Sequence, residues 1–420
     1  MVWRMRAGIP AVQIPLAYLF AIAVVLQLGS AYTLAQDAIK ESRAVSADKP
    51  DGPNEWTDPA TGQRILRLTR RPGPNMSFYF HNNPFVAGQG NEGDLMLFYG
   101  QTDEGMQLFR LNLKTLETRQ LTHQIGRVRG EIVSRKLREA FYQNRSKVYA
   151  VNIDTGTERE VVALPSGSLG GISTINADGT LLAGTFSQGR REILDKYPQK
   201  RDYFNRIFDA KMPSQLFTLD LATGKVTIVH EEVAWLNHLQ FSPTDPNLLM
   251  YCHEGPWHKL QRIWLIDVAT QKIRRIHERT IDREIAGHEF WSPDGQTIWF
   301  DLQIPRGETF YLAGYNLASE RETRYRLERN EWSVHYNISP DQKLFCGDGG
   351  DSSSVAHSDN GKWMYLFEPD GDKLRSTRLA DLGRHDYELE PNTHFTPDGR
   401  WIVFRSNMHG PPQIYALVRK

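Results

Sequence analysis

The chain has 420 residues, and its 50 lysines and arginines balance 50 aspartates and glutamates, so the formal net charge is zero. A balanced charge without a long basic stretch argues against nucleic acid as the main partner. With 40% hydrophobic and 24% charged residues, the composition excludes wholesale disorder. The two cysteines, Cys252 and Cys346, exclude a disulfide scaffold or a four-thiolate zinc site, and they either form one bridge or remain free.

The N-terminus predicts an exported protein. Arg4 and Arg6 precede an apolar run over residues 14–28, and small residues follow it. This order is typical of a signal peptide, which we place at residues 1–35. The alternative is an uncleaved anchor, but the run is shorter than the roughly 20 residues of a spanning helix. Residues 36–57 are polar and predict a flexible leader. The sequence has no second apolar run of this kind, so no membrane segment is predicted after cleavage of the signal peptide.

From Arg64 onward, one two-part pattern recurs. A hairpin of alternating bulky and polar residues appears at residues 108–122, 148–162, 216–230, 263–277, 310–327 and 364–379. Before most of these hairpins, a Pro-Asp-Gly-type turn joins two further strands, as in INADGTLLAG, FSPTDPNLLMY, WSPDGQTIWF, ISPDQKLFCG and FTPDGRWIVF. The two parts make a four-stranded unit with the spacing of propeller blades. The sequence therefore predicts an all-β, seven-bladed β-propeller over residues 58–420.

The two ends of this region predict how the ring closes. The last unit is one strand short, while the first begins with an orphan strand at residues 64–71. We expect the N-terminal strand to complete the C-terminal blade and to leave no open edge. One unit is longer than the others, and its surplus, at about residues 190–212, predicts a helical insertion in blade three.

Histidines concentrate on one predicted face of the ring. Ten of the thirteen lie in or beside the loops between second and third strands or the connections between blades. Because histidine acts as base, acid and metal ligand near neutral pH, this concentration favours a reactive site on that face. His238, His288, His335 and His394 stand at or just before innermost strands, where side chains can reach the central channel. For each of them alone, a structural histidine is the alternative.

Other polar residues of this face are candidates for substrate contacts. His253, Glu254 and His258 lie in the loop CHEGPWH, where an acid beside a histidine suits a carboxylate–imidazole pair. A plain surface loop is the alternative. Arg129 and Arg405 are candidate clamps for a carboxylate, with solvated arginines as the alternative.

Other motifs are weak or missing. Asp348 and Asp351 in GDGGD suit a hard cation, although their spacing is not that of an EF-hand loop. The chain has no G-x-S-x-G elbow, no P-loop and no H-E-x-x-H sequence.

Taken together, several of these segments resemble the oligogalacturonate lyases. The segments are NHLQFSPTDPNLLMYCHEGPWHKLQRIWLID, AGHEFWSPDGQTIWFDLQ, EWSVHYNISPD, GDGGD and EPNTHFTPDGRWIVFRSNMHG. CHEGPWH and GHEFW are specific to this resemblance, whereas the SPDG turns occur in any TolB-like propeller. The resemblance implies a seven-bladed propeller that cleaves short pectin-derived oligogalacturonates by β-elimination. It also implies a divalent cation, expected to be Mn²⁺ with Ca²⁺ as the alternative.

The resemblance implies roles for individual residues. His238 matches the catalytic histidine, which removes the C5 proton of the uronate, and His288 matches a metal-binding histidine. Before the last inner strand the family has a His-Pro-His, where this chain has Glu390-Pro391-Asn392. Glu390 and Asn392 are the expected replacement ligands, since oxygen suits the same class of cation.

Two features depart from the family pattern. Its catalytic arginine stands at the start of the blade-three hairpin, where this chain has Gln215, and Arg201 or Arg206 of the insertion is the expected substitute. The signal peptide implies action on uronides in the periplasm or outside the cell, whereas the family is usually cytoplasmic. The alternative function is an exported TolB-like propeller that binds a protein or glycan partner without catalysis.

Overall fold

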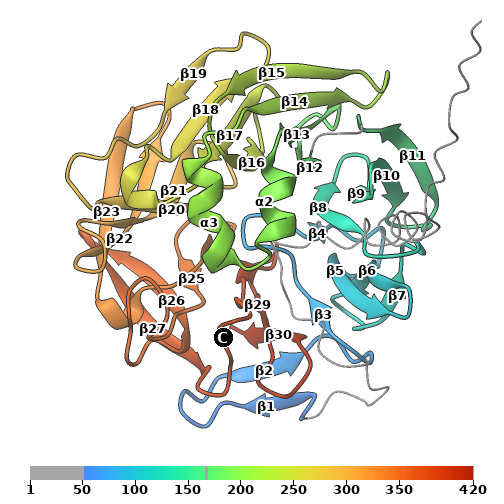
Figure 1. The fold of residues 1–420 in the computed structure, drawn as a ribbon. Coiled ribbons are helices and arrows are strands. Elements are labelled where there is room, and N and C mark those ends of the chain that lie inside the picture. The colour runs from blue at the N-terminus through green and yellow to red at the C-terminus, as the bar shows by residue number, and fades with distance from the viewer. Residues whose placement is uncertain (1–51, 166–168, 420) are drawn as a thin grey trace, which may run out of the picture.

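In the computed structural model, which describes residues 52–165 and 169–419, seven β-sheet blades form a ring (Figure 1). This arrangement confirms the predicted all-β propeller. The predicted signal peptide and most of the predicted leader lie outside the described residues. Within a blade, neighbouring strands are antiparallel, and in blades two to six strand order in space follows strand order in the chain. No helix among the described residues is long and apolar enough to cross a membrane.

The first four blades follow one another along the chain. Blade one contains β3 (Asn75–Met76), β4 (Phe85–Val86), β5 (Leu95–Thr102), β6 (Gly105–Asn112) and β7 (Thr118–Gln120). Blade two contains β8 (Arg129–Ser134), β9 (Glu139–Asn144), β10 (Lys147–Asn152) and β11 (Glu158–Ala163). Blade three contains β12 (Leu169–Ile175), β13 (Leu181–Ser187), β14 (Ser214–Asp220) and β15 (Val226–Glu232). Blade four contains β16 (Leu236–Phe241), β17 (Leu248–His253), β18 (Ile263–Asp267) and β19 (Ile273–Arg275).

Three further blades complete the ring, and two short 3-10 helices lie in a loop of blade four and in the connection from blade five to blade six. Blade five contains β20 (Ile285–Trp291), β21 (Thr297–Gln303), β22 (Phe310–Asn316) and β23 (Arg321–Leu327). Blade six contains β24 (Tyr336–Ile338), β25 (Phe345–Gly347), β26 (Trp363–Asp370) and β27 (Lys373–Asp381). Blade seven contains β28 (His394–Phe395), β29 (Trp401–Ser406) and β30 (Gln413–Val418). The short helices are η1 (Trp257–Lys259) and η2 (Arg329–Glu331).

The N-terminal strand closes the ring. Strand β2 (Arg64–Arg67) pairs with β30, with Ile65 opposite Leu417, so it is the fourth strand of blade seven, as predicted. A further strand, β1 (Glu55–Thr57), pairs with β2. The predicted leader over residues 36–57 is therefore too long, because Trp56 packs edge-on against Tyr415, with ring centroids 5.7 Å apart.

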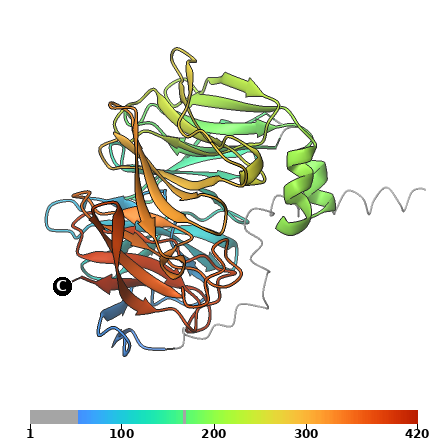
Figure 2. The same cartoon turned by 90° about the vertical axis from the view of Figure 1, so that its left-hand side faces the viewer.

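The long segment of blade three forms two helices between β13 and β14. They are α2 (Arg190–Lys196) and α3 (Lys200–Asp209). Leu194, Tyr203 and Ile207 pack with Trp235 in a small apolar cluster of their own. Figure 2 shows the helices standing out from one face of the ring, and Figure 1 shows them in front of its centre. The insertion therefore overhangs the channel mouth.

The two cysteines do not pair. Cys252 and Cys346 are both free and buried, on β17 and β25. Burial raises the pKa of each thiol, so both thiols remain protonated and pack in the core as small apolar side chains.

Candidate active site at the channel mouth

Backbone irregularities aim three polar side chains at the channel mouth. The pairing register shifts within β16 around His238 and within β20 around His288. Both histidines have a left-handed backbone, with φ of 48° and 49°, and Asn392 before β28 has φ of 53°. In blade two, a glycine, Gly130, has positive φ at the comparable bulge of β8. A bulge with a non-glycine residue in this conformation is strained, and such strain gathers at functional sites.

His238 is paired with a buried carboxylate. Its Nε2 lies 3.2 Å from Glu254 Oε2. The other oxygen of Glu254 accepts bonds from Arg262 Nη1 at 3.0 Å and from the indole N–H of Trp257 at 3.1 Å. Burial opposes ionisation of Glu254, but Arg262 and His238 outweigh it and hold the pKa of that carboxyl well below its ordinary value. His238 therefore faces a permanent negative charge.

The loop CHEGPWH divides its side chains between two sides of blade four. Glu254 contacts His238 and Arg262, whereas His253 stacks on Trp264 and lies 3.0 Å from Glu232 of blade three. Successive side chains of a strand point to opposite faces, so the predicted His253–Glu254 pair does not exist. His258 lies apart from both, near the charges of Arg306, Lys259 and Arg279. The positions of His253 and His258 therefore do not support the predicted substrate contacts at the channel mouth.

Trp257 of the same loop reaches the neighbouring blade. Its ring meets His288 edge-on, with centroids 5.1 Å apart. A Cβ at position 287 would come within 2.9 Å of this indole, so glycine is required there. CHEGPWH and GHEFW therefore interlock, which explains why both motifs occur together.

A second imidazole group lies beside His238. The rings of His288 and His335 are 5.1 Å apart at right-angled orientation, and His335 Nε2 lies 3.6 Å from Glu390 Oε2. Asp348 Oδ2 lies 2.8 Å from His335 Nδ1. Asp301 stands behind His288 at 3.9 Å. We call His288, His335 and Glu390 the imidazole–carboxylate cluster.

The segment Ser77–Asn82 joins the two groups. Tyr79 lies between them, with its ring centroid 5.8 Å from that of His238 and 5.0 Å from that of His335. Phe80 stacks on His335 at 4.6 Å, and its backbone N–H donates to Asn392 Oδ1 at 2.9 Å. Glu131 of β8 fixes the segment by accepting the N–H of Tyr79 at 2.6 Å.

Buried atoms of the site that lack a hydrogen-bond partner indicate whether a cation fits there. His335 Nε2, His288 Nδ1 and Asp301 Oδ2 are buried and have no hydrogen-bond partner. An imidazole that gives one N–H to a carboxylate and leaves its other nitrogen bare is the usual form of a metal-binding histidine, and His335 has this form. In His288 the unpartnered nitrogen is Nδ1, which faces Asp301 Oδ2 at 3.9 Å. Burial lowers the pKa of His288 below its ordinary value, which keeps this imidazole neutral. The cluster therefore fits a divalent cation, with nitrogen and oxygen donors that suit Mn²⁺.

The charge of Glu390 fits the same role. Burial opposes its ionisation, but the nearby imidazoles of His335 and His288 together with the cations Lys200 and Arg405 outweigh burial and lower the pKa of Glu390. Lys200 belongs to α3, so the inserted helices contribute to the field at the channel mouth.

A different group of three ligands fits a softer ion. Among the described residues, His238, Cys252 and Glu254 form the one set of His, Cys, Asp or Glu side chains whose ligand atoms lie within 4.8 Å of one another. Its thiol is protonated and its carboxylate is already neutralised by Arg262. Thiolate ligands suit Zn²⁺ better than Mn²⁺, so this set does not fit the expected cation.

Asn392 and Arg405 have structural contacts at the site. The Asn392 amide accepts from Phe80 and donates to the carbonyl of Glu390 at 3.0 Å, so the amide expected as a metal ligand is engaged with backbone. Arg405 donates to the carbonyls of Glu390 at 2.8 Å and Ser77 at 2.9 Å. Arg129 begins β8, the innermost strand of blade two.

None of the three positions considered for the catalytic arginine brings a guanidinium to His238. Gln215 donates to Glu231 on the neighbouring strand at 2.5 Å. The Arg201 side chain is 86% exposed, and Arg206 stacks on Tyr197 within the insertion. The arginine beside the His238 pair is Arg262, which sequence analysis did not select.

The chain is similar to known proteins over most of its length. The family model described as oligogalacturonate lyase matches residues 53–419. The oligogalacturonide lyase of Pectobacterium atrosepticum is 25% identical over 86% of this chain and 94% of its own length. The oligogalacturonate lyase of Dickeya dadantii is 26% identical over the same shares. A solved oligogalacturonate lyase in complex with manganese is 24% identical, covers 90% of this chain and 99% of its own, and superposes with a TM-score of 0.74.

Proposed function

The chain belongs to the oligogalacturonate lyase family, and we propose that it cleaves oligogalacturonates by β-elimination with His238 as the base. The observation that carries this proposal is the pairing of His238 with the ionised, buried Glu254 at the channel mouth. A histidine so placed is close to the cluster that fits a cation, because Tyr79 contacts both His238 and His335.

The proposed proton transfer involves His238, Glu254 and Arg262. His238 keeps a proton on Nε2 toward Glu254, so Nδ1 is the nitrogen that takes the C5 proton of the uronate. The electrons of the C5–H bond form the C4=C5 double bond as the C4–O bond breaks, and the departing oxygen takes a proton from solvent. The resulting imidazolium of His238 is stabilised by Glu254, whose own charge Arg262 balances.

His288, His335 and Glu390 would hold the cation beside His238. A bound divalent cation such as Mn²⁺ supplies electrophilic stabilisation of the uronate carboxylate, which makes the adjacent C5 proton more acidic. Asp348 orients the imidazole of His335 through a hydrogen bond from behind, and Asp301 stands 3.9 Å behind that of His288. No pair of glycosidase carboxylates is needed, because no water attacks the sugar.

The mass of the product tests this function. An elimination leaves one product with an unsaturated sugar, which is lighter by one water than the product of hydrolysis. We expect purified protein with Mn²⁺ to convert trigalacturonate into an unsaturated product of that mass. Products with the mass of hydrolysis fragments would contradict the proposal. Unchanged substrate that nevertheless binds would favour the non-catalytic propeller.

We also propose that the chain is exported. The basic start, the apolar run and the small-residue exit of residues 1–35 support this localisation. Expression of the full chain in a Gram-negative host, followed by fractionation and N-terminal sequencing, tests it. We expect a periplasmic protein that begins after Ala31 or Ala35. Retention in the cytoplasm with an intact N-terminus would contradict it.

A further inference from the structure

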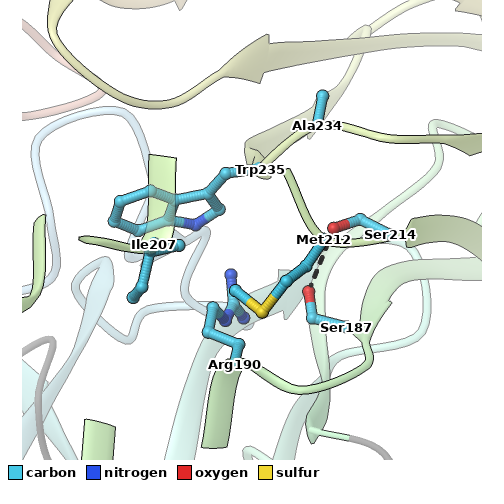
Figure 3. Close-up of a pocket in the computed structure, with 7 residues that line it drawn as sticks. All are labelled: Ser187, Arg190, Ile207, Met212, Ser214, Ala234 and Trp235. Atoms are coloured by element: carbon cyan, nitrogen blue, oxygen red, sulfur yellow. Dashed lines mark hydrogen bonds between the residues drawn. The ribbon is translucent and has the colours of Figure 1, made fainter. Parts of the chain in front are cut away.

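The insertion encloses a small cavity against blades three and four (Figure 3). Its apolar lining includes Ile207 and Met212, and its polar lining is made by Ser187, Ser214, Arg190 and Trp235. The empty space among its lining atoms is about 180 Å³, but this figure includes space that is open to solvent. The space for the centre of a water-sized group is only about 10 Å³, roughly what a single water needs, so this cavity admits one small polar group of a ligand and no sugar ring.

Two buried donors of the cavity have no partner. Arg190 Nη1 and Trp235 Nε1 are buried without a hydrogen bond, and the Trp235 side chain belongs to a residue only 9% exposed. The Arg190 guanidinium lies 5.8 Å from the Trp235 ring centroid. Among the ion pairs of residues 52–165 and 169–419, none involves Arg190. Because unpaired buried donors are costly, this arrangement indicates a ligand that accepts hydrogen bonds.

The donor set indicates an anion with more than one oxygen. Burial lowers the pKa of Arg190 to about 10, so it is still positively charged at neutral pH. The hydroxyls of Ser187 and Ser214 lie 3.2 Å apart, and since one proton satisfies that contact, the second hydroxyl hydrogen is available to the cavity. A guanidinium, an indole N–H and a hydroxyl match the oxygens of a carboxylate.

The cavity lies beside the His238 pair. The backbone carbonyl of Trp235 accepts the N–H of Glu254 at 2.8 Å, and Glu254 contacts His238. His238 is the third residue after Trp235, so their Cα atoms are at most about 11 Å apart. An oligomer with a carboxylate on every sugar can therefore reach both places at once.

We propose that Arg190, Trp235 and the paired serines bind the carboxylate of a second uronide unit while the sugar beside His238 reacts. This subsite rests on the proposed function. It accepts the carboxylate alone, and the sugar ring remains at the cavity entrance. The insertion thereby acts as a binding element that favours oligomers over single uronates.

Binding measurements on an uncleaved substrate test the subsite. In the His238→Ala background, isothermal titration calorimetry compares trigalacturonate with its fully methyl-esterified form. Replacing a charged buried donor commonly weakens binding by about tenfold or more, so we expect that loss for trigalacturonate with Arg190→Gln. Binding of the ester is expected to remain unchanged. Arg190→Lys should keep most of the affinity, and Trp235→Phe should lose a smaller part.

The control is Arg191→Gln, since the Arg191 side chain is 53% exposed and faces Asp195. We expect this variant to bind like its parent. Circular dichroism and the thermal midpoint show whether each variant is folded. If Arg190→Gln is unfolded, Trp235→Phe, which keeps an aromatic ring but removes the indole N–H, carries the test.

The outcomes separate the subsite from the proposed function. If the wild-type protein cleaves trigalacturonate but Arg190→Gln and Trp235→Phe bind it as tightly as the parent, the subsite is wrong and the lyase stands. An equal loss for the ester and the acid would also overturn the subsite, because it would show a general distortion. If the parent binds no uronide and the wild type cleaves none, both proposals fail.

Discussion

At the scale of single residues, the channel mouth is a set of imidazoles, each with a carboxylate close by. Glu254 faces His238, Asp348 holds His335, and Asp301 stands behind His288. Such a carboxylate selects which ring nitrogen carries the proton. The carboxylates therefore decide which nitrogen is left to act as base or ligand.

Asp348 provides a prediction about metal affinity. Asp348→Asn replaces the charged acceptor of His335 Nδ1 by a neutral one, and loss of such a partner typically costs about 10–100-fold in affinity. We expect Mn²⁺ to bind correspondingly more weakly in calorimetric titration. Asp351→Asn is the control, because the Asp351 carboxylate caps the turn at Ser353 and Ser354 instead. Equal Mn²⁺ affinity of Asp348→Asn and wild type would contradict the assignment of His335.

His385 provides a prediction about stability. Its ring is buried between Ser406 and the carbonyl of Leu389, and burial lowers its pKa to about 4. Below pH 6.5 this imidazole is protonated in the unfolded chain, whereas in the folded chain it stays neutral down to about pH 4. The free energy of unfolding therefore falls over that window, by up to about 3 kcal/mol.

Urea unfolding at several pH values checks this stability prediction. His385→Gln should flatten the decline between pH 6.5 and 4. Part of the decline should persist, because burial also lowers the pKa of His394 to about 4. The exposed His123 supplies the control, His123→Gln. A His385→Gln variant with the full wild-type slope would show that His385 does not titrate in this way.

Residue types at the site could be predicted from the sequence, but side-chain directions could not. His238 and His288 were found from their motifs. The backbone bulges that direct their side chains have no clear sequence signal, apart from the glycine, Gly130, at the comparable bulge of blade two. Tyr79 and Phe80 were missed because they come before the first clear repeat. A run of aromatic residues beside a histidine, as in SFYFHN, is the signal that would have identified them.

At the scale of elements, strand periodicity corrects the sequence analysis. Hairpin repeats correctly predicted strands in all blades, because alternation and turn residues are local properties. The pairing of His253 with Glu254 was wrong because neighbours on a strand face opposite sides. The partner of Glu254 is His238 on the adjacent strand, a contact that depends on register and therefore on the folded blade.

The insertion provides a prediction at this scale. Ile207 is 2% exposed and belongs to the cluster that holds α2 and α3 on Trp235. Ile207→Ala removes buried methylenes, which commonly costs about 2–5 kcal/mol. Because the cluster is separate from the blade cores, we expect faster proteolysis within residues 190–212 and little change in the thermal midpoint.

Arg201→Ala, on the exposed side of α3, is the matched control for limited proteolysis. It should be cleaved at the wild-type rate. A large drop in the thermal midpoint of Ile207→Ala, with no selective cleavage of the insertion, would show that the helices and the ring unfold together.

At the scale of the whole molecule, the ring is closed by chain ends that lie far apart in sequence. β2 completes blade seven beside β30, and Ile65 is buried in a cluster with Ile402 and Leu417. Closure was predictable because an orphan first strand and a missing last strand are complementary. The further strand β1 was not predicted, since its three residues are too few to show a period.

Truncation tests this closure. Removal of residues 1–51 leaves the described blades complete and should leave the thermal midpoint unchanged. Removal of residues 1–69 exposes the edge of β30 and the apolar cluster beneath it, so we expect aggregation or a midpoint lower by more than about 10 °C. Equal stability of the two truncated proteins would show that blade seven does not need its N-terminal strand.

The central claim is that His238 acts as the base of a metal-assisted elimination. Its most direct test follows the ultraviolet absorbance of unsaturated uronides during incubation with oligogalacturonates, first with Mn²⁺ and then with a chelator. We predict a rise with metal, its arrest by chelator, and a loss of at least about 100-fold in rate for His238→Ala. A His238→Ala protein that remains as active as wild type, or a wild-type protein that stays inactive with Mn²⁺, would contradict this account.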